Sequence, residues 1–246
     1  MPSLWLGLRT AAIYMALIAA ATVYVFQLTS APADTIETLS GMLPFQFLVA
    51  VYCVYIVRRY FGWRAVGFGP IQWRAMIWLA PAWVVLAAMG WNIAQVLTVQ
   101  EFLAIGPRGL AFLIVTPFVI AFAEEVMFRG ILLRGAMATV PLFNAMLISA
   151  GLFGAMHLIN GVSGQDSAGT TQQIGFAVLV GFFLAPIAVK LGNLWPLIIW
   201  HWLWNIAVLT SQMADVFHPF VVIGIAMQTV VCIWLWSDLL RGKIAG

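Results

Sequence analysis

The chain has 246 residues, of which 64% are hydrophobic and 8% are charged. Soluble globular domains average about 25% charged residues, so eleven Lys and Arg and eight Asp and Glu cannot cover a water-facing surface. The composition therefore excludes a soluble enzyme, a disordered protein and a nucleic-acid-binding domain. A net charge of +3 provides no basic surface for phosphates either. The length predicts a single integral-membrane domain over residues 1–246.

Eight apolar segments are candidate transmembrane helices, since a membrane span needs about 20 mostly apolar residues. In chain order they cover residues 4–28, 39–57, 75–99, 110–138, 142–159, 173–191, 194–211 and 217–236. The first segment loosely resembles a signal peptide, but its apolar core is longer than the usual ~7–15 residues, so we expect a retained helix. The sequence predicts an all-α polytopic membrane helix bundle of about eight transmembrane helices.

The charged residues predict the orientation of these helices. If eight spans alternate, most basic residues fall on one side of the membrane and most acidic loop residues on the other. The basic side holds Arg9, Arg58, Arg59, Arg64, Arg74, Arg134, Lys190, Arg241 and Lys243. The opposite loops hold Asp34, Glu37, Glu101, Asp166 and Asp215, with Arg108 as their one base. By the positive-inside rule, both termini are expected to be cytoplasmic.

The long connection after the second span, residues 58–74, mixes four arginines with several large aromatic residues. This composition is typical of a segment that lies in the membrane interface. Such a segment either anchors the protein or contacts a substrate or lipid.

Three ionisable residues lie inside the fourth span, at Glu124, Glu125 and Arg129. Each costs about 2.5–3.5 kcal/mol near the centre of a membrane helix, so they must be paired, hydrated or used. Glu125 and Arg129 are four residues apart on one helix face, and Arg129 is expected to hold Glu125 charged in an ion pair. Glu124 is turned about 100° away and therefore needs a partner from another span.

Two later spans supply candidate partners, because the fifth contains Phe153 and His157 and the seventh contains His201 and Asn205. The helical rise places Glu124 about 21 Å and His157 about 22 Å from the cytoplasmic ends of their spans, so these two residues are expected to meet. His201 is only about 10 Å from the start of its span. It is therefore expected to be shallower, unless that span starts deeper in the membrane.

A carboxylate and a histidine in a dry site form a general-base arrangement, in which Glu124 and His157 polarise a water for attack on a carbonyl. His201 and the Asn205 amide could donate hydrogen bonds to the oxyanion that develops. Alternatively, Glu124, His157 and His201 are three ligands of a zinc ion, with water in the fourth position. A third interpretation is a buried polar network that only fixes helix packing.

These residues resemble the three motifs of the CAAX protease and bacteriocin-processing (CPBP, or Abi) family, which includes the type II CAAX prenyl endopeptidases. The motifs occur in order, each in a predicted span, within a core of about residues 110–211. They are Glu124-Glu125-x-x-x-Arg129, Phe153-x-x-x-His157 and His201-x-x-x-Asn205.

The resemblance implies an all-α intramembrane protease with an active-site cavity inside the bundle. It implies that Glu124 and His157 activate the water and that His201 and Asn205 bind the oxyanion or a ligand. The supporting residues that it implies are Glu125, Arg129 and Phe153. Family members are commonly named metalloproteases, yet Asn205 is a poor zinc ligand and a good amide donor, which favours a glutamate mechanism. A zinc ion on Glu124, His157 and His201 stays open as the alternative.

The predicted function is therefore an intramembrane endopeptidase that hydrolyses a peptide bond of a membrane-associated substrate. Eukaryotic members cleave prenylated C-terminal tripeptides, whereas this short, loop-poor chain looks like a multi-pass protein of the bacterial inner membrane. Its expected partners are membrane lipid and a membrane-anchored peptide or protein. Two alternatives remain: a non-catalytic immunity or regulatory protein of the same family, and a proton or ion carrier that uses the Glu and His residues as a relay.

Overall fold

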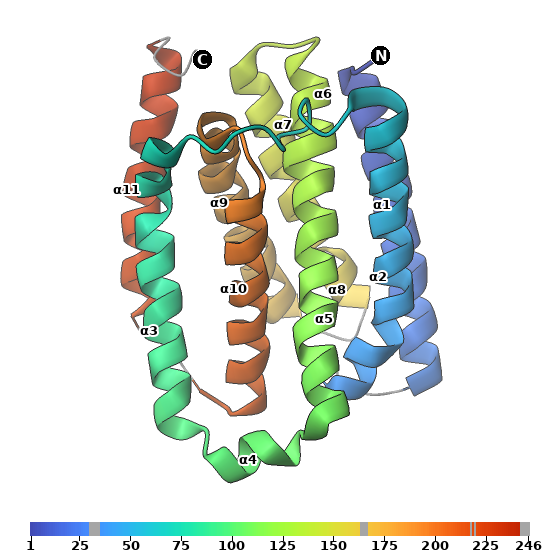
Figure 1. Ribbon diagram of the computed structural model, residues 1–246, viewed down its shortest axis with the longest axis vertical. Helices are drawn as coiled ribbons and strands as arrows, with labels where there is room; N and C mark the ends of the chain where they lie inside the picture. Colours follow the sequence, from blue (N-terminus) through green and yellow to red (C-terminus); the bar gives the residue numbers. More distant parts are fainter. Residues whose placement is uncertain (30–34, 163–166, 217, 219, 242–246) are drawn as a thin grey trace.

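Long apolar helices lie side by side along one axis in the computed structural model of the protein (Figure 1). The structure describes residues 1–29, 35–162, 167–216, 218 and 220–241. Its helices are α1 (Leu4–Thr29), α2 (Ile36–Ile56), the π-helix η1 (Val57–Phe61), the 3-10 helix η2 (Trp73–Leu79), α3 (Ala80–Val96), α4 (Val99–Ala104), α5 (Gly106–Glu125), the π-helix η3 (Val126–Leu132), α6 (Leu133–Met137), α7 (Leu142–Met156), α8 (Ile159–Val162), α9 (Ser167–Leu191), α10 (Trp195–Met213) and α11 (Val221–Leu240). The predicted all-α class is confirmed.

Within the described residues, six helices are long and apolar enough to cross a membrane, and the protein is an integral membrane protein. These six are Leu4–Phe26, Ile36–Phe61, Trp73–Val96, Gly106–Met137, Leu142–Gly161 and Ser167–Leu191. They overlap the first six predicted spans. The predicted number of about eight is not confirmed by these six: α10, which carries several polar residues, is not among them, and the apolar stretch described in α11 is Ile223–Asp238.

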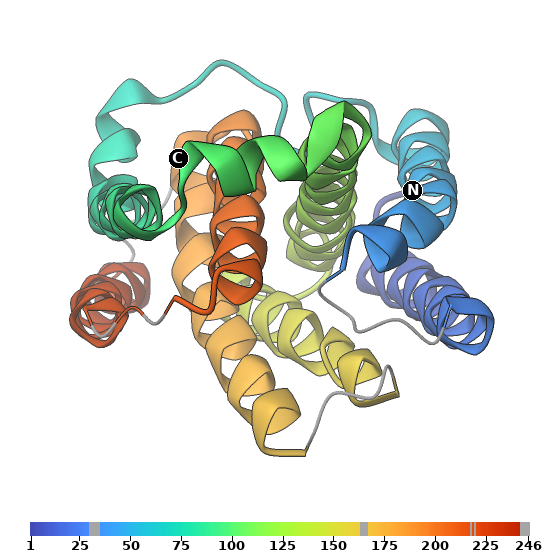
Figure 2. The same cartoon turned by 90° about the horizontal axis from the view of Figure 1, so that it is seen from below.

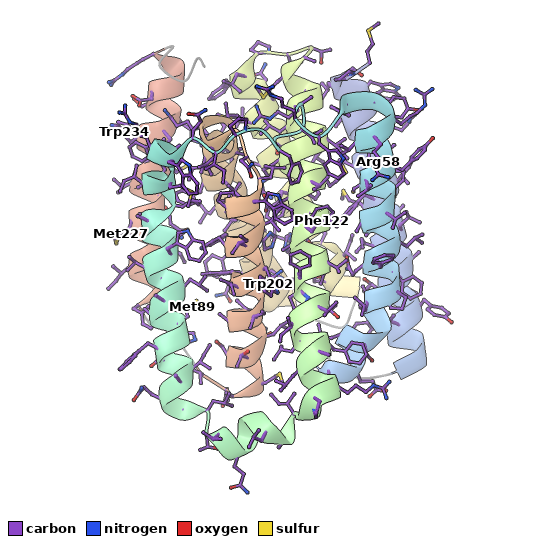
Figure 3. The ribbon with its side chains drawn as sticks, viewed as in Figure 1. Arg58, Met89, Phe122, Trp202, Met227 and Trp234 are labelled. Carbon is purple, nitrogen blue, oxygen red and sulfur yellow. The ribbon has the colours of Figure 1, made fainter. Side chains whose placement is uncertain are left out.

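The two described ends of the chain lie at the same end of the bundle, which is the upper end in Figure 1. The η1–η2 connection and the α6–α7 and α9–α10 turns are found there too. Arg58 marks this end on the α2 side (Figure 3). Which side of the membrane it faces stays a prediction, and three of the loop charges behind that prediction, Asp34, Asp166 and Lys243, lie outside the described residues.

The η1–η2 connection, expected in the membrane interface, is hydrogen-bonded to the α9–α10 turn over its middle part. The Leu194 amide donates to the Gly67 carbonyl at 2.7 Å, and the Gly69 amide donates to the Gly192 carbonyl at 3.1 Å. Gly67 and Gly192 have φ angles of +100° and +63°, which favour glycine. We call residues 62–72 the strap. It fixes the point at which α10 begins, which Figure 1 shows below the upper ends of α6 and α7.

Helix α5 lies between α10 on one side and α2 on the other when the molecule is seen from below (Figure 2). Pro117 has no N–H and so disturbs the hydrogen bonding of the preceding turn of α5. The indole N–H of Trp202, between α10 and α5 in Figure 3, donates to the Ile114 carbonyl at 2.9 Å. Backbone groups need such partners inside a membrane. This bond sets the position of α10 along α5.

Helices α7 and α9 approach closely because two glycines leave room between them. A Cβ atom on Gly154 would lie 2.1 Å from Val178 Cγ2, and one on Gly181 would lie 2.8 Å from Ala150 Cα. Small residues at such contacts are typical of helix pairs in membranes. The contact holds α7, and with it Phe153 and His157, against the centre of the bundle.

Candidate active site

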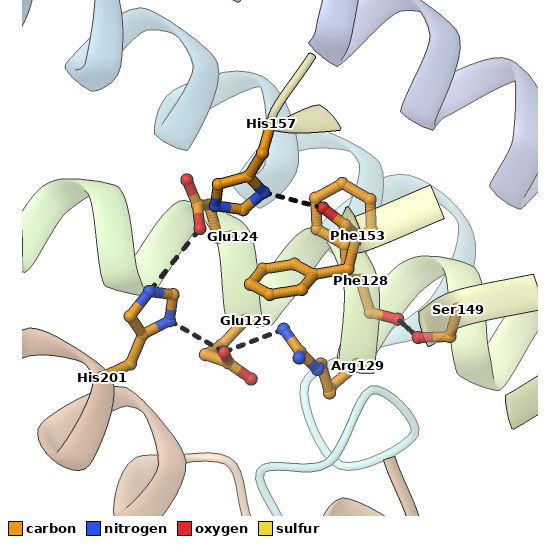
Figure 4. Close-up of polar contacts among 8 residues, drawn as sticks. All are labelled: Glu124, Glu125, Phe128, Arg129, Ser149, Phe153, His157 and His201. Carbon is orange, nitrogen blue, oxygen red and sulfur yellow. Dashed lines mark hydrogen bonds and ion pairs between the residues drawn. The ribbon is translucent and has the colours of Figure 1, made fainter. Parts of the chain in front are cut away.

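The first motif lies where α5 changes into the π-helix η3. Glu124 and Glu125 are the last two residues of α5, and Arg129 lies within η3 (Figure 4). π-Helical turns inside α-helices are frequent at functional sites. The hydroxyl of Ser149 on α7 donates to the Phe128 carbonyl of η3 at 2.8 Å, and its side chain is fully buried. The π-helix is therefore tied to α7 at the turn that carries the site.

Glu125 and Arg129 form the ion pair expected from their four-residue spacing. Arg129 Nη1 donates to Glu125 Oε1 at 2.9 Å, and both side chains are fully buried. The Arg129 guanidinium also lies over the Phe153 ring, 4.0 Å from its centroid. The Arg129 guanidinium is thus held inside the bundle by the Glu125 carboxylate and by the face of the Phe153 ring.

His201 joins the two glutamates (Figure 4). Its Nδ1 atom is 2.9 Å from Glu125 Oε1, and its Nε2 atom is 3.6 Å from Glu124 Oε2. Because α10 begins below the ends of α6 and α7, His201 lies at the depth of the glutamates, as expected if its span starts deeper in the membrane. Glu124 has the partner from another span that the sequence required, and this partner is His201.

His157 follows the last residue of α7, and its Nδ1 atom is 2.9 Å from the Phe153 carbonyl oxygen. A carbonyl only accepts, so this nitrogen carries the proton and Nε2 is left as an acceptor. His157 lies beside Glu124 (Figure 4), but among the described residues no hydrogen bond or ion pair joins these two side chains. The bond from Nδ1 to the Phe153 carbonyl therefore fixes the orientation of the His157 ring and leaves Nε2 free of a backbone partner.

Phe153 is the aromatic centre of the cluster. Its ring packs edge-on against the rings of Phe128, His157 and His201, with centroids 5.4, 5.2 and 6.1 Å away. The same ring lies under the Arg129 guanidinium. One buried phenylalanine from α7 therefore contacts groups from all three motifs and keeps their side chains in place.

The cluster is exposed on one face only. Glu125 and Arg129 have no exposed side-chain surface, whereas the side chains of Glu124 and His201 keep 12% and 9%. His157 and Asn205 are partly exposed, and Asn205 lies one helical turn after His201. The Asn205 amide has no hydrogen bond to another residue of the described chain. The partly exposed groups are therefore the ones able to meet a substrate, whereas the ion pair of Glu125 and Arg129 is buried behind them.

The described residues do not fit the zinc site considered from the sequence. A catalytic zinc needs three protein ligands, and no group of three or more His, Cys, Asp or Glu side chains in the described chain is arranged to hold a metal ion. Both His201 nitrogens face carboxylates, and His157 directs Nδ1 to a backbone carbonyl. We therefore derive no step through a metal.

Two residues that position the site were missed in the sequence. Ser149 holds the π-helix, and Trp202 sets the position of α10. The sequence does show a serine in an apolar span, which needs a hydrogen-bond partner, and a proline in α5, which leaves a backbone carbonyl in need of a donor. Neither identifies its partner, because the partners are backbone carbonyls on other helices.

The fold and this cluster define a polytopic membrane protein with a buried Glu–Arg–His site. Residues 106–207 match the family described as Type II CAAX prenyl endopeptidase Rce1-like. The match includes all the residues of the three motifs. It confirms, at the level of the family, the resemblance of the sequence to CAAX-type intramembrane proteases. No curated protein and no solved structure matches the chain.

Proposed function

We propose that the protein is an intramembrane endopeptidase that hydrolyses a peptide bond of a membrane-associated peptide or protein. The observation that carries this proposal is the arrangement of Glu124 against His201, with the ion pair of Glu125 and Arg129 fixed behind them. A carboxylate held on the exposed face of an otherwise buried cluster is placed to act on a water molecule. The family match over residues 106–207 supports the same reaction.

In the proposed reaction, Glu124 takes a proton from a water molecule while the water oxygen bonds to the carbonyl carbon of the substrate. His157 accepts a hydrogen bond from the same water at Nε2, since its Nδ1–H is held by the Phe153 carbonyl. The C–N bond then breaks as the proton on Glu124 passes to the leaving nitrogen. The products are a carboxylic acid, which keeps the second proton of the water until it ionises, and an amine, and no covalent enzyme intermediate forms.

The oxyanion of the tetrahedral intermediate needs hydrogen-bond donors that are already in place. Asn205 supplies an amide that the described fold does not use. His201 can donate from Nε2 as an imidazolium, in which Nδ1–H donates to Glu125 and Nε2–H is left for the oxyanion. We assign these two groups from α10 to the oxyanion, opposite the water held by Glu124 and His157.

The depth of the cluster indicates the kind of substrate. Glu124 is the second-last residue of α5, a largely apolar helix of 20 residues, so the scissile bond must enter the membrane. A lipid-anchored peptide or a transmembrane segment can do this, whereas a free soluble peptide cannot. We propose a location in the bacterial inner membrane, with lipid and such an anchored substrate as partners.

The test is cleavage of a fluorogenic prenylated peptide by the purified protein in liposomes. Glu124→Gln and His157→Ala are expected to lose activity while their thermal unfolding is unchanged. The matched control is Glu37→Gln, an exposed glutamate in the first turn of α2, which should cleave like the wild type. Wild-type rates in both active-site variants would show that these residues are not catalytic, and proton flux that depends on Glu124 would favour the carrier instead.

A further inference from the structure

Tyr14 on α1 has a buried hydroxyl that the described fold does not use. The side chain is fully buried, and its oxygen has no hydrogen-bond partner in the described structure. A phenylalanine would fill the same space without burying an unpaired polar group, so the hydroxyl is a cost to folding. Unpaired buried groups of this kind call for an explanation in terms of function.

The helix register places Tyr14 at the depth of the glutamates. Helix α1 runs antiparallel to α5 and η3 (Figure 1), and a Cβ on Gly7 would lie 3.1 Å from Leu132 Cα. Tyr14 is seven residues below this contact, or about 10.5 Å. Glu124 is eight residues below Leu132, mostly along the π-helix η3, whose rise per residue is smaller than that of an α-helix, so it lies at most about 12 Å lower. The two residues therefore lie at nearly the same level of the bundle.

Neighbouring contacts put the Tyr14 ring against the same stretch of helix. The ring packs edge-on against Phe128, with centroids 6.1 Å apart. The Cys53 thiol, from α2, lies 3.9 Å from the Ala123 carbonyl, next to Glu124 in the chain. Tyr14 thus approaches Glu124 from α1, while His201 approaches from α10.

We propose that Tyr14 is a positioning residue of the catalytic centre, whose hydroxyl donates a hydrogen bond to the Glu124 carboxyl group in the hydrated site. Hydrogen bonds of a catalytic site are often incomplete in the absence of substrate, which agrees with the unpaired hydroxyl here. Tyr14 lies outside residues 106–207, so the matched family segment does not contain it. The kinetic part of the test rests on the proposed peptidase function.

The variant Tyr14→Phe removes the hydroxyl and keeps the ring contact with Phe128. We expect kcat to fall about tenfold, as for the loss of one hydrogen bond to a charged group, with KM within twofold of the wild type. The thermal midpoint should be unchanged or higher. Tyr24→Phe, on the same helix but with an exposed ring, is the matched control and should keep wild-type kinetics.

A double-mutant cycle tests whether Tyr14 acts through Glu124. In a Glu124→Asp background, Tyr14→Phe should reduce the remaining kcat much less than tenfold. A full tenfold reduction in that background, or an unchanged kcat in the single variant, overturns the proposal.

Infrared spectroscopy provides a readout that does not depend on catalysis. The bands of the Glu124 carboxyl group, identified by their loss in Glu124→Gln, should shift in Tyr14→Phe and not in Tyr24→Phe. Unshifted bands overturn the proposal. If the wild type cleaves no peptide, the proposed function fails, and this measurement alone still decides whether Tyr14 bonds Glu124.

Discussion

The Nδ1 atom of His201 lies 2.9 Å from Oε1 of Glu125, although 76 residues separate them in the chain. The same carboxylate oxygen accepts from Arg129. Glu125 therefore links a helix-local ion pair to a histidine from another helix. Through this link, the position of His201 opposite Glu124 depends on a charge that no substrate touches.

Removing Arg129 should destabilise the protein strongly, because the charge of Glu125 is then left buried without its counter-ion. We expect Arg129→Leu to lower the free energy of unfolding by about 3–5 kcal/mol, measured by thermal unfolding in detergent. The double variant Glu125→Met/Arg129→Leu should recover part of this stability, since no buried charge is left. It should not recover peptide cleavage, because His201 has lost the group that orients it; recovery of cleavage would contradict this role.

Asn205 should matter for catalysis and little for stability. Its amide forms no hydrogen bond within the described chain, so Asn205→Ala leaves no partner unpaired. Loss of an oxyanion donor typically lowers kcat by about 10²–10³, and we expect this range with an unchanged thermal midpoint. Asn144→Ala, at an exposed position of α7, is the control. Equal kcat values for the two variants would remove Asn205 from the site.

Replacing Ser149 should lower both the stability and the activity of the protein. The variant Ser149→Ala leaves the Phe128 carbonyl in η3 without its 2.8 Å donor, which we expect to cost about 1–3 kcal/mol. Because η3 carries Arg129, kcat should fall as well. The control is Ser40→Ala, whose exposed hydroxyl bonds only to the carbonyl three residues earlier in its own helix. If Ser149→Ala unfolds and cleaves like Ser40→Ala, the bond to η3 has no role in positioning the site.

The glutamate mechanism predicts that chelation leaves peptide cleavage unchanged. The purified protein should be incubated with a strong zinc chelator, and its metal content and initial rates measured before and after. We expect substoichiometric zinc and equal rates. Stoichiometric zinc whose removal abolishes cleavage, and whose return restores it, would contradict the glutamate mechanism.

Local parts of the site could be predicted from the sequence because helix geometry determines them. The pair of Glu125 and Arg129 follows from their spacing of four residues, and Glu124 had to find its partner outside its own helix for the same reason. The candidate partners were His157 and His201, and the structure pairs Glu124 with His201. The depth of a residue in the bundle depends on where its helix begins. The start of α10 is set by the hydrogen bonds of Leu194 and Gly192 to the strap, which the sequence does not reveal.

Other parts depend on contacts that a single sequence does not reveal. The number of about eight spans is not confirmed, since six helices of the described chain are long and apolar enough to cross a membrane and α10, which carries His201 and Asn205, is not among them. The strap has an interfacial composition, yet its backbone pairs with the α9–α10 turn. Tyr14 looks like any aromatic residue of an apolar span until its burial and its neighbours are known.

The ion pair within one helix also bears on how the protein is made. When α5 leaves the ribosome, Glu125 and Arg129 can neutralise each other at once, whereas His201 is still 76 residues from being synthesised. At about 5–20 residues per second, that interval lasts on the order of 4–15 s. During it, the insertion machinery handles a segment with one unbalanced carboxyl group instead of three separate charges. The spacing of four residues thus lets the reactive helix enter the bilayer before the histidine that completes it exists.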